Sequence, residues 1–358
     1  MEPNPYFEPD FLGLSAKHFD SYAETTLVVA HERDTFRGVL PIVKFEKPRI
    51  PPRVIARIGT SPGGYRALGT PLLDAACPDL AADALLDALK GAAKERGWPG
   101  ILFMDFVGSD GPVAESLLRA CRTRGVPVFT KDSWERGRVH RGGRWEDPLT
   151  KSRARQVAKG RRGLLRDSGT ELKLVDRTLD PSVVEEFVVM EAAGWKGKEG
   201  GWAFAKDPRK VAWFREWYER WAPTGRLVVL CLELGGEPVA FQFCVRAGDG
   251  VFLFREAYDE TYSRYGPGAM IVADTMEYLL QHSDALWVDS GTDKGNAFLL
   301  EMLPEPRTLA TLYLGTGGKL DRAVMTALPA MTRLATSARN LRQRMTKTRS
   351  TETDMVNA

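Results

Sequence analysis

GVFLFREAYDETYSRYGPGAM, residues 250–270, runs from an apolar strand through a Gly-Pro-Gly turn into an amphipathic helix. The start of a helix leaves backbone N–H groups unpaired and carries about half a positive charge. Gly266 and Gly268 have no side chains to obstruct an anion, and Arg264 lies two residues before the turn. The pattern therefore predicts a phosphate site made mainly of backbone. The alternative is that the glycines only turn the chain into the helix.

Further regular segments surround this turn. Upstream lie the strand-like runs RLVVLCLEL (226–234) and PVAFQFCVRA (238–247), joined by a Gly-Gly turn. Downstream, apolar residues follow helical spacing over 269–281, and the strand-like run ALWVDSG (285–291) comes next. The predicted order is three strands, the turn, a helix and a strand.

Other segments stand in a fixed order along the chain. They are PNPYFEPDFL, KSRARQVAKGRRGLLRDSGTELKL, MEAAGWKGKEGGWAF, a strand pair with GEPVAF, AYDETYSRYGPGAM and WVDSGTDKGN. The element order resembles the core of the GNAT acyltransferase superfamily, in which the turn cradles the pyrophosphate of coenzyme A. The segments together resemble the cellulose-biosynthesis type of acetyltransferase, a GNAT branch related in architecture to the Fem peptidyltransferases. The resemblance covers most of residues 3–315 and is strongest over 151–314.

This resemblance implies an α/β fold with two GNAT-like lobes in tandem, each a mixed sheet flanked by helices. A chain of 358 residues with 43% hydrophobic content can bury two cores. We expect an N-terminal lobe without a cofactor site at 1–148, a catalytic lobe at 149–318, and a basic amphipathic helix with a disordered tail at 319–358. In the first half, SPGGYRALGTP (61–71) is either a loop near the cleft between the lobes or a plain surface loop.

The composition argues against several other classes of protein and site. No apolar run reaches the roughly 18 residues of a membrane span, and the N-terminus lacks the pattern of a secretory signal, so the default expectation is a cytoplasmic protein. Cys231 and Cys244 fall in strand patterns and are expected to be buried thiols. The four cysteines and four histidines show no metal-ligand spacing and no triad pattern. We therefore predict no metal site.

Acyl transfer from a thioester to an amine needs a neutral nucleophile, a site for the developing oxyanion and a proton for the leaving thiolate. In GNAT enzymes the thioester carbonyl is held by backbone N–H groups of the strand before the turn, here residues 255–258. The resemblance implies acyl-CoA, typically acetyl-CoA, as the co-substrate. Its expected binding residues are Arg255, Ala257, Tyr258, Arg264, Tyr265, Gly266, Gly268 and Ala269.

Three carboxylates are candidates for the general base, and the pattern favours Glu191 and Asp289 slightly over Glu256. Glu191 opens the EAAGWKG phrase, Asp289 ends a strand, and Glu256 lies on the strand before the turn. Each also has a structural alternative: Glu191 could cap or pair with a neighbouring helix, Asp289 could order the DSGTDKGN loop, and Glu256 could pair with an arginine across strands.

Aromatic residues suggest where the acceptor binds. Trp195 and Trp202, beside glycines, suit a substrate-binding wall, and Lys196 would either contact an acidic group of the substrate or be exposed. Other tryptophans recur at helical intervals and are expected in the core: Trp213, Trp217 and Trp221. Many family members carry a Tyr-Lys pair after the last strand, whereas this chain reads GNAFLLEMLPEPR. The thiolate would then be protonated by solvent or by a tyrosine near the turn: Tyr258, Tyr262 or Tyr265.

Two stretches are strongly basic. Residues 151–166 contain seven basic residues and no acidic one, which fits a solvated helix or a docking surface for an anionic substrate or tRNA. Residues 323–350 contain six, interspersed with apolar residues. They would form a helix that touches an anionic membrane or a partner, or one that packs on its own protein. A net charge of +3 does not favour general binding of nucleic acid, so no DNA partner is expected.

The leading hypothesis is an N-acyltransferase that moves an acyl group, with acetyl expected, from acyl-CoA directly to an amine of a sugar, amino acid, peptide or specialised metabolite. One alternative is a Fem-like transferase that uses aminoacyl-tRNA as the donor. Another is a non-catalytic role in the assembly of envelope polysaccharide.

Overall fold

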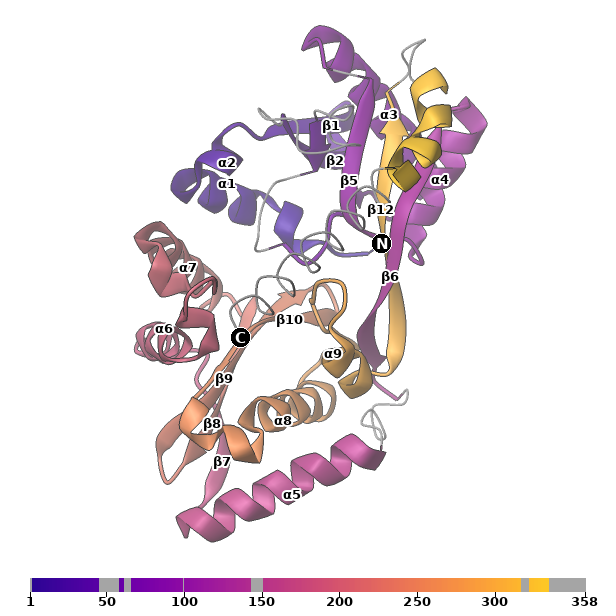
Figure 1. The fold of residues 1–358 in the computed structure, drawn as a ribbon. Coiled ribbons are helices and arrows are strands. Elements are labelled where there is room, and N and C mark those ends of the chain that lie inside the picture. The colour runs from indigo at the N-terminus through magenta and orange to yellow at the C-terminus, as the bar shows by residue number, and fades with distance from the viewer. Residues whose placement is uncertain are drawn as a thin grey trace, which may run out of the picture.

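The computed structural model describes residues 2–44, 58–60, 66–98, 100–142, 151–316 and 322–334. Helices flank one twisted sheet of twelve strands in this part of the chain, and two lobes share that sheet (Figure 1). Along the sheet the strands follow the order β1-β2-β3-β5-β12-β6-β11-β10-β9-β8-β7, and β4 pairs with β2. Strands far apart in sequence therefore meet at its centre.

The N-terminal lobe begins with three short helical segments that precede its strands. Its elements are η1 (Pro5–Phe7), α1 (Pro9–His18), α2 (Asp20–Ala23), β1 (Thr26–Glu32), β2 (Thr35–Lys44), β3 (Ile58–Thr60), β4 (Leu72–Leu73), α3 (Pro78–Glu95), β5 (Ile101–Gly108), α4 (Pro112–Arg124) and β6 (Val128–His140). The α4 helix ends at Gly125, whose φ of 64° is the left-handed conformation that glycine adopts readily. The glycine therefore sets where α4 stops and the chain turns into β6.

The C-terminal lobe carries the strand order that the sequence predicts. Its elements are α5 (Lys151–Ser168), β7 (Leu172–Asp176), α6 (Val183–Ala193), η3 (Trp195–Gly197), η4 (Phe204–Lys206), α7 (Pro208–Trp221), β8 (Leu227–Leu234), β9 (Glu237–Ala247), β10 (Gly250–Tyr258), η5 (Glu260–Tyr265), α8 (Pro267–His282), β11 (Trp287–Asp289), α9 (Ala297–Met302) and β12 (Glu305–Gly315). The three predicted strands, the turn and the helix after it are confirmed within a few residues.

Alternate residues of the central strands face different helices, as the twofold period of a strand requires. Val229 and Phe243 belong to the core that includes α6 and α7, whereas Leu230 and Cys244 belong to the core that includes α8. Both faces of this sheet are thus covered. The expected core residues are confirmed, because Trp213, Trp217, Trp221, Cys231 and Cys244 are all buried.

The two lobes interlock through their strands. The β12 strand, late in the chain, lies between β5 and β6 of the N-terminal lobe. In turn the last residues of β6 pair with β11 of the C-terminal lobe. The expected lobe boundary at 148/149 falls in residues 143–150, outside the described part of the chain.

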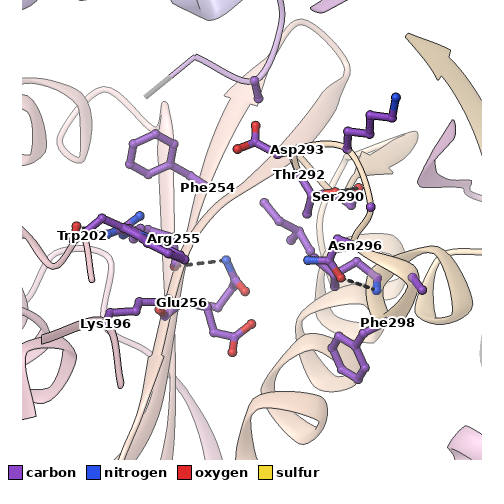
Figure 2. Close-up of a pocket in the computed structure, with 18 of the residues that line it drawn as sticks. Lys196, Trp202, Phe254, Arg255, Glu256, Ser290, Thr292, Asp293, Asn296 and Phe298 are labelled. Carbon is purple, nitrogen blue, oxygen red and sulfur yellow. Dashed lines mark hydrogen bonds between the residues drawn. The ribbon is translucent and has the colours of Figure 1, made fainter. Parts of the chain in front are cut away.

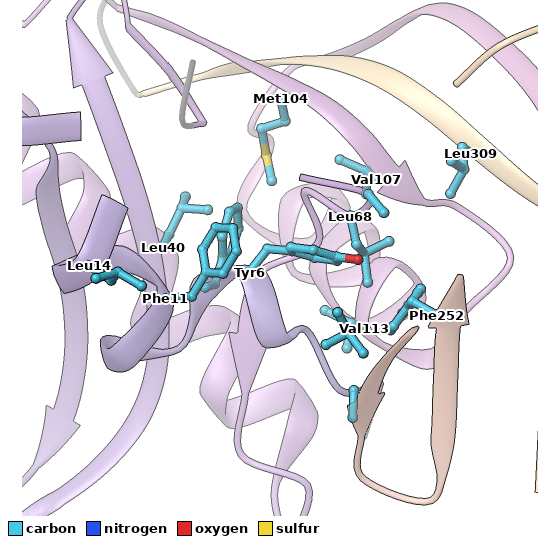
Figure 3. Packing of buried hydrophobic residues seen from close by; sticks show 14 of the residues in the cluster. Tyr6, Phe11, Leu14, Leu40, Leu68, Met104, Val107, Val113, Phe252 and Leu309 are labelled. Atoms are coloured by element: carbon cyan, nitrogen blue, oxygen red, sulfur yellow. The ribbon is translucent and has the colours of Figure 1, made fainter. Parts of the chain in front are cut away.

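A shared core also joins the lobes. Tyr6 and Phe11, from the N-terminal segment, pack in one cluster with Met104 of β5, Phe252 of β10 and Leu309 of β12 (Figure 3). The same cluster reaches α7, where the rings of Phe11 and Trp213 meet edge to face with their centroids 5.7 Å apart. The N-terminal segment therefore fixes one lobe against the other.

Part of the basic C-terminal stretch is described. Residues 322–334 form a helix, and its Met325 and Leu328 are buried against Phe103 of β5 and Tyr313 of β12. The described portion thus packs on its own protein, and residues 335–358 lie outside the described part. Across the described ranges, no helix combines the length and apolarity needed to cross a membrane.

Candidate functional site

A cavity of about 750 Å³ lies where β10 and β11 diverge (Figure 2). The β10 strand pairs with β11 only over residues 250–252, and a β-bulge opposite β9 follows between Leu253 and Arg255. Beyond the bulge β10 and β11 are no longer paired, and we call the space between them the splay. The cavity is lined by Arg66, Ala67, Trp195, Lys196, Trp202, Gln242, Leu253, Phe254, Arg255, Glu256 and residues 290–299.

Both lobes contribute to this cavity. Arg66 and Ala67 come from the N-terminal lobe and belong to the segment 61–71, for which the sequence left two alternatives, a loop near the cleft or a plain surface loop. In the described part of that segment, 66–71, these two residues line the cavity, which agrees with the first alternative, whereas 61–65 lie outside the described residues.

Glu256 points from β10 into the cavity (Figure 2). Its carboxylate makes no hydrogen bond or ion pair with any residue that the structure describes. Burial raises the pKa of Glu256, and the positive charge of Lys196 opposes that rise only in part. A carboxyl with a raised pKa and an unused oxygen suits the role of a general base.

Lys196 reaches the same strand from the η3 segment. Its ammonium donates a hydrogen bond to the backbone carbonyl of Glu256, and it lies 5.6 Å from the centre of the Trp195 ring. Burial lowers the pKa of Lys196, and Arg255 lowers it further, whereas Glu256 and Glu191 oppose this shift. The site thus holds a base with a raised pKa beside an acid with a lowered one.

The backbone of β10 offers donors to the splay. The N–H of Asp259 donates to Val239 of β9, so the odd-numbered residues after the bulge face β9. The backbone N–H and C=O groups of the even-numbered residues point away from β9. Lys196 donates to one of these groups, the carbonyl of Glu256. The N–H groups of Glu256 and Tyr258 therefore face the splay.

The other two predicted carboxylates lie in different surroundings. Glu191 is 2% exposed and accepts hydrogen bonds from the Nε of Arg255 at 2.6 Å and from the backbone N–H of Phe204 at 2.8 Å. It borders a small pocket beside α6 rather than the main cavity. In this position Glu191 holds Arg255 and the η4 segment in place.

Asp289 is also fully buried. Its carboxylate pairs with Arg136 at 2.8 Å and with Arg307 at 2.8 Å, and it accepts the N–H of Gly291 at 2.9 Å. Arg136 also donates to the carbonyl of Ala67. Asp289 therefore binds one arginine from β6 and one from β12, and it also orders the loop after β11. These contacts tie the two lobes together.

The predicted phosphate turn lies at the start of α8. Gly266 has a φ of 73°, and the N–H groups of Ala269 and Met270 both bond back to its carbonyl. Apart from its chain neighbours, no described residue lies within 4 Å of a Cβ built on Gly266, so the turn is open toward the described part of the chain. A Cβ on Gly268 would lie 2.8 Å from Oε1 of Glu256. The helix start and the candidate base are therefore neighbours.

The remaining predicted cofactor residues fall into three groups. Arg264 and Tyr265 point toward α5, where the hydroxyl of Tyr265 donates to Asp167 at 2.8 Å and Arg264 pairs with the same carboxylate. Arg255 and Ala257 face the α6 side of the sheet. Only Tyr258 shares the face of Glu256 and lies against Gly268.

Sequence reasoning missed several cavity residues. Gln242 donates to the carbonyl of Arg255 at 3.2 Å, and Asn296 caps α9 through the N–H of Leu299 at 3.1 Å. Phe254 occupies the bulge, and Phe298 faces it across the cavity (Figure 2). The WVDSGTDKGN phrase pointed to the loop that carries Asn296, but no local signal reveals the bulge.

Residues 151–297 match the family model described as "Acetyltransferase (GNAT) domain". This part of the chain is therefore similar to GNAT domains. The match includes the splay, the turn and Glu256, although it does not distinguish the cellulose-biosynthesis type within the GNAT proteins. No curated protein matches the chain.

Solved structures extend the similarity to both lobes. FemX is 11% identical with a TM-score of 0.57, over 87% of this chain and 92% of that chain. A conserved protein of unknown function from Bacteroides thetaiotaomicron is 14% identical with a TM-score of 0.53, over 87% and 91%. L-PGS from Bacillus licheniformis is 13% identical with a TM-score of 0.51, over 94% and 99%. At such identities the likeness shows the fold, which here is two GNAT-like lobes in tandem.

Proposed function

We propose that this protein is an N-acyltransferase that moves an acyl group, with acetyl expected, from acyl-CoA directly to an amine. The acceptor would be an amine of a sugar, amino acid, peptide or specialised metabolite. One observation carries the proposal: in the part of the chain that matches a GNAT domain, Glu256 has a raised pKa and no hydrogen-bond or ion-pair partner among the described residues, and it lies in the cavity at the splay beside backbone donors. Together these groups provide a base and an oxyanion site, which aminolysis of a thioester requires.

The donor fits the open end of the splay. In this proposal the N–H groups of Glu256 and Tyr258 hold the thioester carbonyl, and the turn at Gly266 receives the pyrophosphate at the start of α8. An anion can approach the backbone there, because, apart from the chain neighbours of Gly266, no described residue lies within 4 Å of a Cβ on that glycine. Glu256 then accepts the proton that the attacking amine loses.

The acceptor would enter the cavity between the tryptophans of the C-terminal lobe and the Arg66 segment of the N-terminal lobe. Trp195 and Trp202 form an edge-to-face pair with centroids 4.9 Å apart, and they are 44% and 50% exposed. Exposed tryptophans at the mouth of a cavity favour a ligand with some apolar surface. Arg66 from the N-terminal lobe supplies positive charge on the same cavity. We therefore assign Trp195, Trp202 and the segment at Arg66 to acceptor binding.

The direct test is release of free thiol from acetyl-CoA and longer acyl-CoAs with a panel of amines, with products identified by mass spectrometry. We expect turnover by the wild-type chain and a decrease of about 100- to 10,000-fold in Glu256→Gln. Glu277→Gln is the matched control, since Glu277 is an exposed carboxylate on α8. Absence of thiol release with every donor and amine, or equal activity of the two variants, would contradict the proposal.

A second candidate function is transfer of an aminoacyl group from tRNA, and the surface of α5 favours it. Its exposed basic residues recur at intervals of three and four and form one solvent-facing stripe: Arg155, Lys159, Arg162 and Arg166. The first three form no ion pair with any described residue. Such a stripe can bind a phosphate backbone by releasing counterions.

This alternative predicts salt-sensitive binding of tRNA. If three side chains each contact a phosphate, replacing Arg155, Lys159 and Arg162 by Glu would reduce the slope of log K against log salt by about 2 to 3. The control replaces three exposed basic residues of the N-terminal lobe: Lys90, Lys94 and Arg96. Binding that neither set of changes weakens would remove the support that α5 gives to this function.

A further inference from the structure

The position of Lys196 on the edge of β10 suggests a specific chemical role. Along that edge the carbonyl of Glu256 lies between the N–H groups of Glu256 and Tyr258, because both groups of an even-numbered residue face the splay. Lys196 donates to this carbonyl. Successive residues on one edge are only about 7 Å apart. A thioester carbonyl held by either N–H would place its sulfur within a few ångströms of the ammonium.

The backbone that carries Lys196 is firmly held. Its carbonyl accepts the N–H of Ala203 at 3.0 Å, and the N–H of the preceding Trp195 donates to Glu260 at 2.5 Å. A Cβ on Gly197 would lie 1.8 Å from the carbonyl oxygen of Ala192, and one on Gly201 would lie 2.2 Å from that of Lys196. Only glycine permits these close approaches. The segment 194–203 therefore presents Lys196 to β10 in one position, as a site on a preorganised support requires.

We propose that Lys196 is the general acid that protonates the leaving thiolate while Glu256 accepts the proton of the attacking amine. This inference rests on the proposed function. As the C–N bond forms, a proton passes from the amine nitrogen to the Glu256 carboxylate. As the C–S bond breaks, an N–H bond of the Lys196 ammonium breaks and an S–H bond forms. Glu256 then returns its proton to the neutral Lys196, and the products are an amide and a free thiol.

The surroundings suit this division of roles. Burial lowers the pKa of Lys196 and raises that of Glu256, so each group gives up or takes a proton more readily than it would in water. The tyrosines near the turn are less suitable donors. The hydroxyl of Tyr265 is bonded to Asp167 on α5, and burial raises the pKa of Tyr258 above 10.0.

The test compares Lys196→Met and Lys196→Arg, each with two donors, acetyl-CoA and the activated thioester S-(4-nitrophenyl) thioacetate. Methionine keeps much of the length but has no proton to give. Arginine keeps the charge and the hydrogen bond, but it does not release a proton near neutral pH. We expect both variants to lose about 100- to 10,000-fold in kcat with acetyl-CoA. With the aryl thioester the loss should be below about tenfold, because its thiolate leaves without protonation.

Calorimetry with acetyl-CoA and thermal unfolding show whether each variant still binds the donor and folds. Wild-type kcat in Lys196→Arg, or equal losses with both donors, would overturn this inference and indicate a role in binding or charge alone. If the wild-type chain itself releases no thiol from any acyl-CoA, the proposed function fails instead. The two failures are therefore distinguishable.

Discussion

Glu191, Glu256 and Asp289 carry the same functional group in three different environments. Glu191 holds Arg255, Asp289 holds two arginines, and Glu256 makes no such bond with the described residues. A carboxylate that neutralises a buried arginine has its charge committed, whereas an unpaired one is available to a substrate. This difference in partners is why we assign the base to Glu256.

The same difference predicts opposite effects on stability. Asp289→Asn should lower the free energy of unfolding by about 3–5 kcal/mol, because Arg136 and Arg307 would stay buried without their counter-charge. Glu256→Gln should change it by about 1 kcal/mol or less. Urea unfolding followed by circular dichroism measures both. Equal destabilisation would show that Glu256 has a structural role that its contacts do not reveal.

The raised pKa of Glu256 predicts the acid limb of the activity profile. The base acts only when ionised, so log kcat/KM should rise with pH through the raised pKa, which lies above 4.5, and then level off. Glu256→Gln should remove that limb, and the exposed Glu277→Gln should keep it. A limb unchanged in Glu256→Gln would assign the titration to another group, such as the acceptor amine.

At this scale the sequence identified the right residue types but not their partners. Glu256, Lys196 and the two exposed tryptophans were candidates from their local phrases, and the structure places all four on one cavity. Arg136 and Arg307 could not be paired with Asp289, since they lie 153 and 18 residues away along the chain. Long-range ion pairs of this kind depend on the tertiary fold.

Among the elements, α5 has a contact that the sequence pattern does not reveal. The helix packs against η5 so closely that a Cβ on Gly160 would lie 2.0 Å from the carbonyl oxygen of Tyr265 and 3.0 Å from the end of Met270. At Gly163 the nearest atoms, in the Tyr265 ring, would be 3.4 Å away, which is ordinary contact. Basic residues dominated the sequence of α5, but its two glycines determine where it packs.

These two glycines provide a matched test. Gly160→Ala should destabilise the protein by about 1–3 kcal/mol, because the added methyl pushes α5 off the turn. Gly163→Ala should be neutral or stabilising by up to about 1 kcal/mol, through its higher helix propensity. Thermal unfolding of the two variants measures the difference. Similar behaviour of both would argue against close packing of α5 on the turn.

The elements around the turn could be predicted because each leaves a local pattern. Apolar runs mark β8 and β9, and glycines mark the turn before α8. The bulge in β10 leaves no such pattern, because it depends on how β9 pairs with β10. The sequence reveals neither the bulge nor the short pairing of β10 with β11. The splay that creates the cavity could therefore not be predicted.

For the molecule as a whole, the exchange of strands between the lobes has the largest consequence. The β12 strand completes the N-terminal sheet, and β6 joins the C-terminal one. A fragment that begins at residue 149 would leave β12 without β5 and β6 and would expose two strand edges. We expect this fragment alone to aggregate or remain unfolded, and co-expression with 1–148 to recover soluble protein. A soluble, cooperatively folded fragment would show that the C-terminal lobe is independent.

We propose that acyl-CoA binds with its phosphates at the start of α8. Calorimetry of acetyl-CoA with the wild-type chain, Gly266→Asp and Gly266→Asn tests it most directly, because Asp and Asn both tolerate a positive φ and both cap helices. We predict that Gly266→Asn binds within about threefold of the wild type. We predict that Gly266→Asp loses more than about tenfold, or 1.4 kcal/mol, through repulsion of the phosphates. Equal affinity of the two variants, or no binding by the wild-type chain, would contradict binding of the phosphates at this turn.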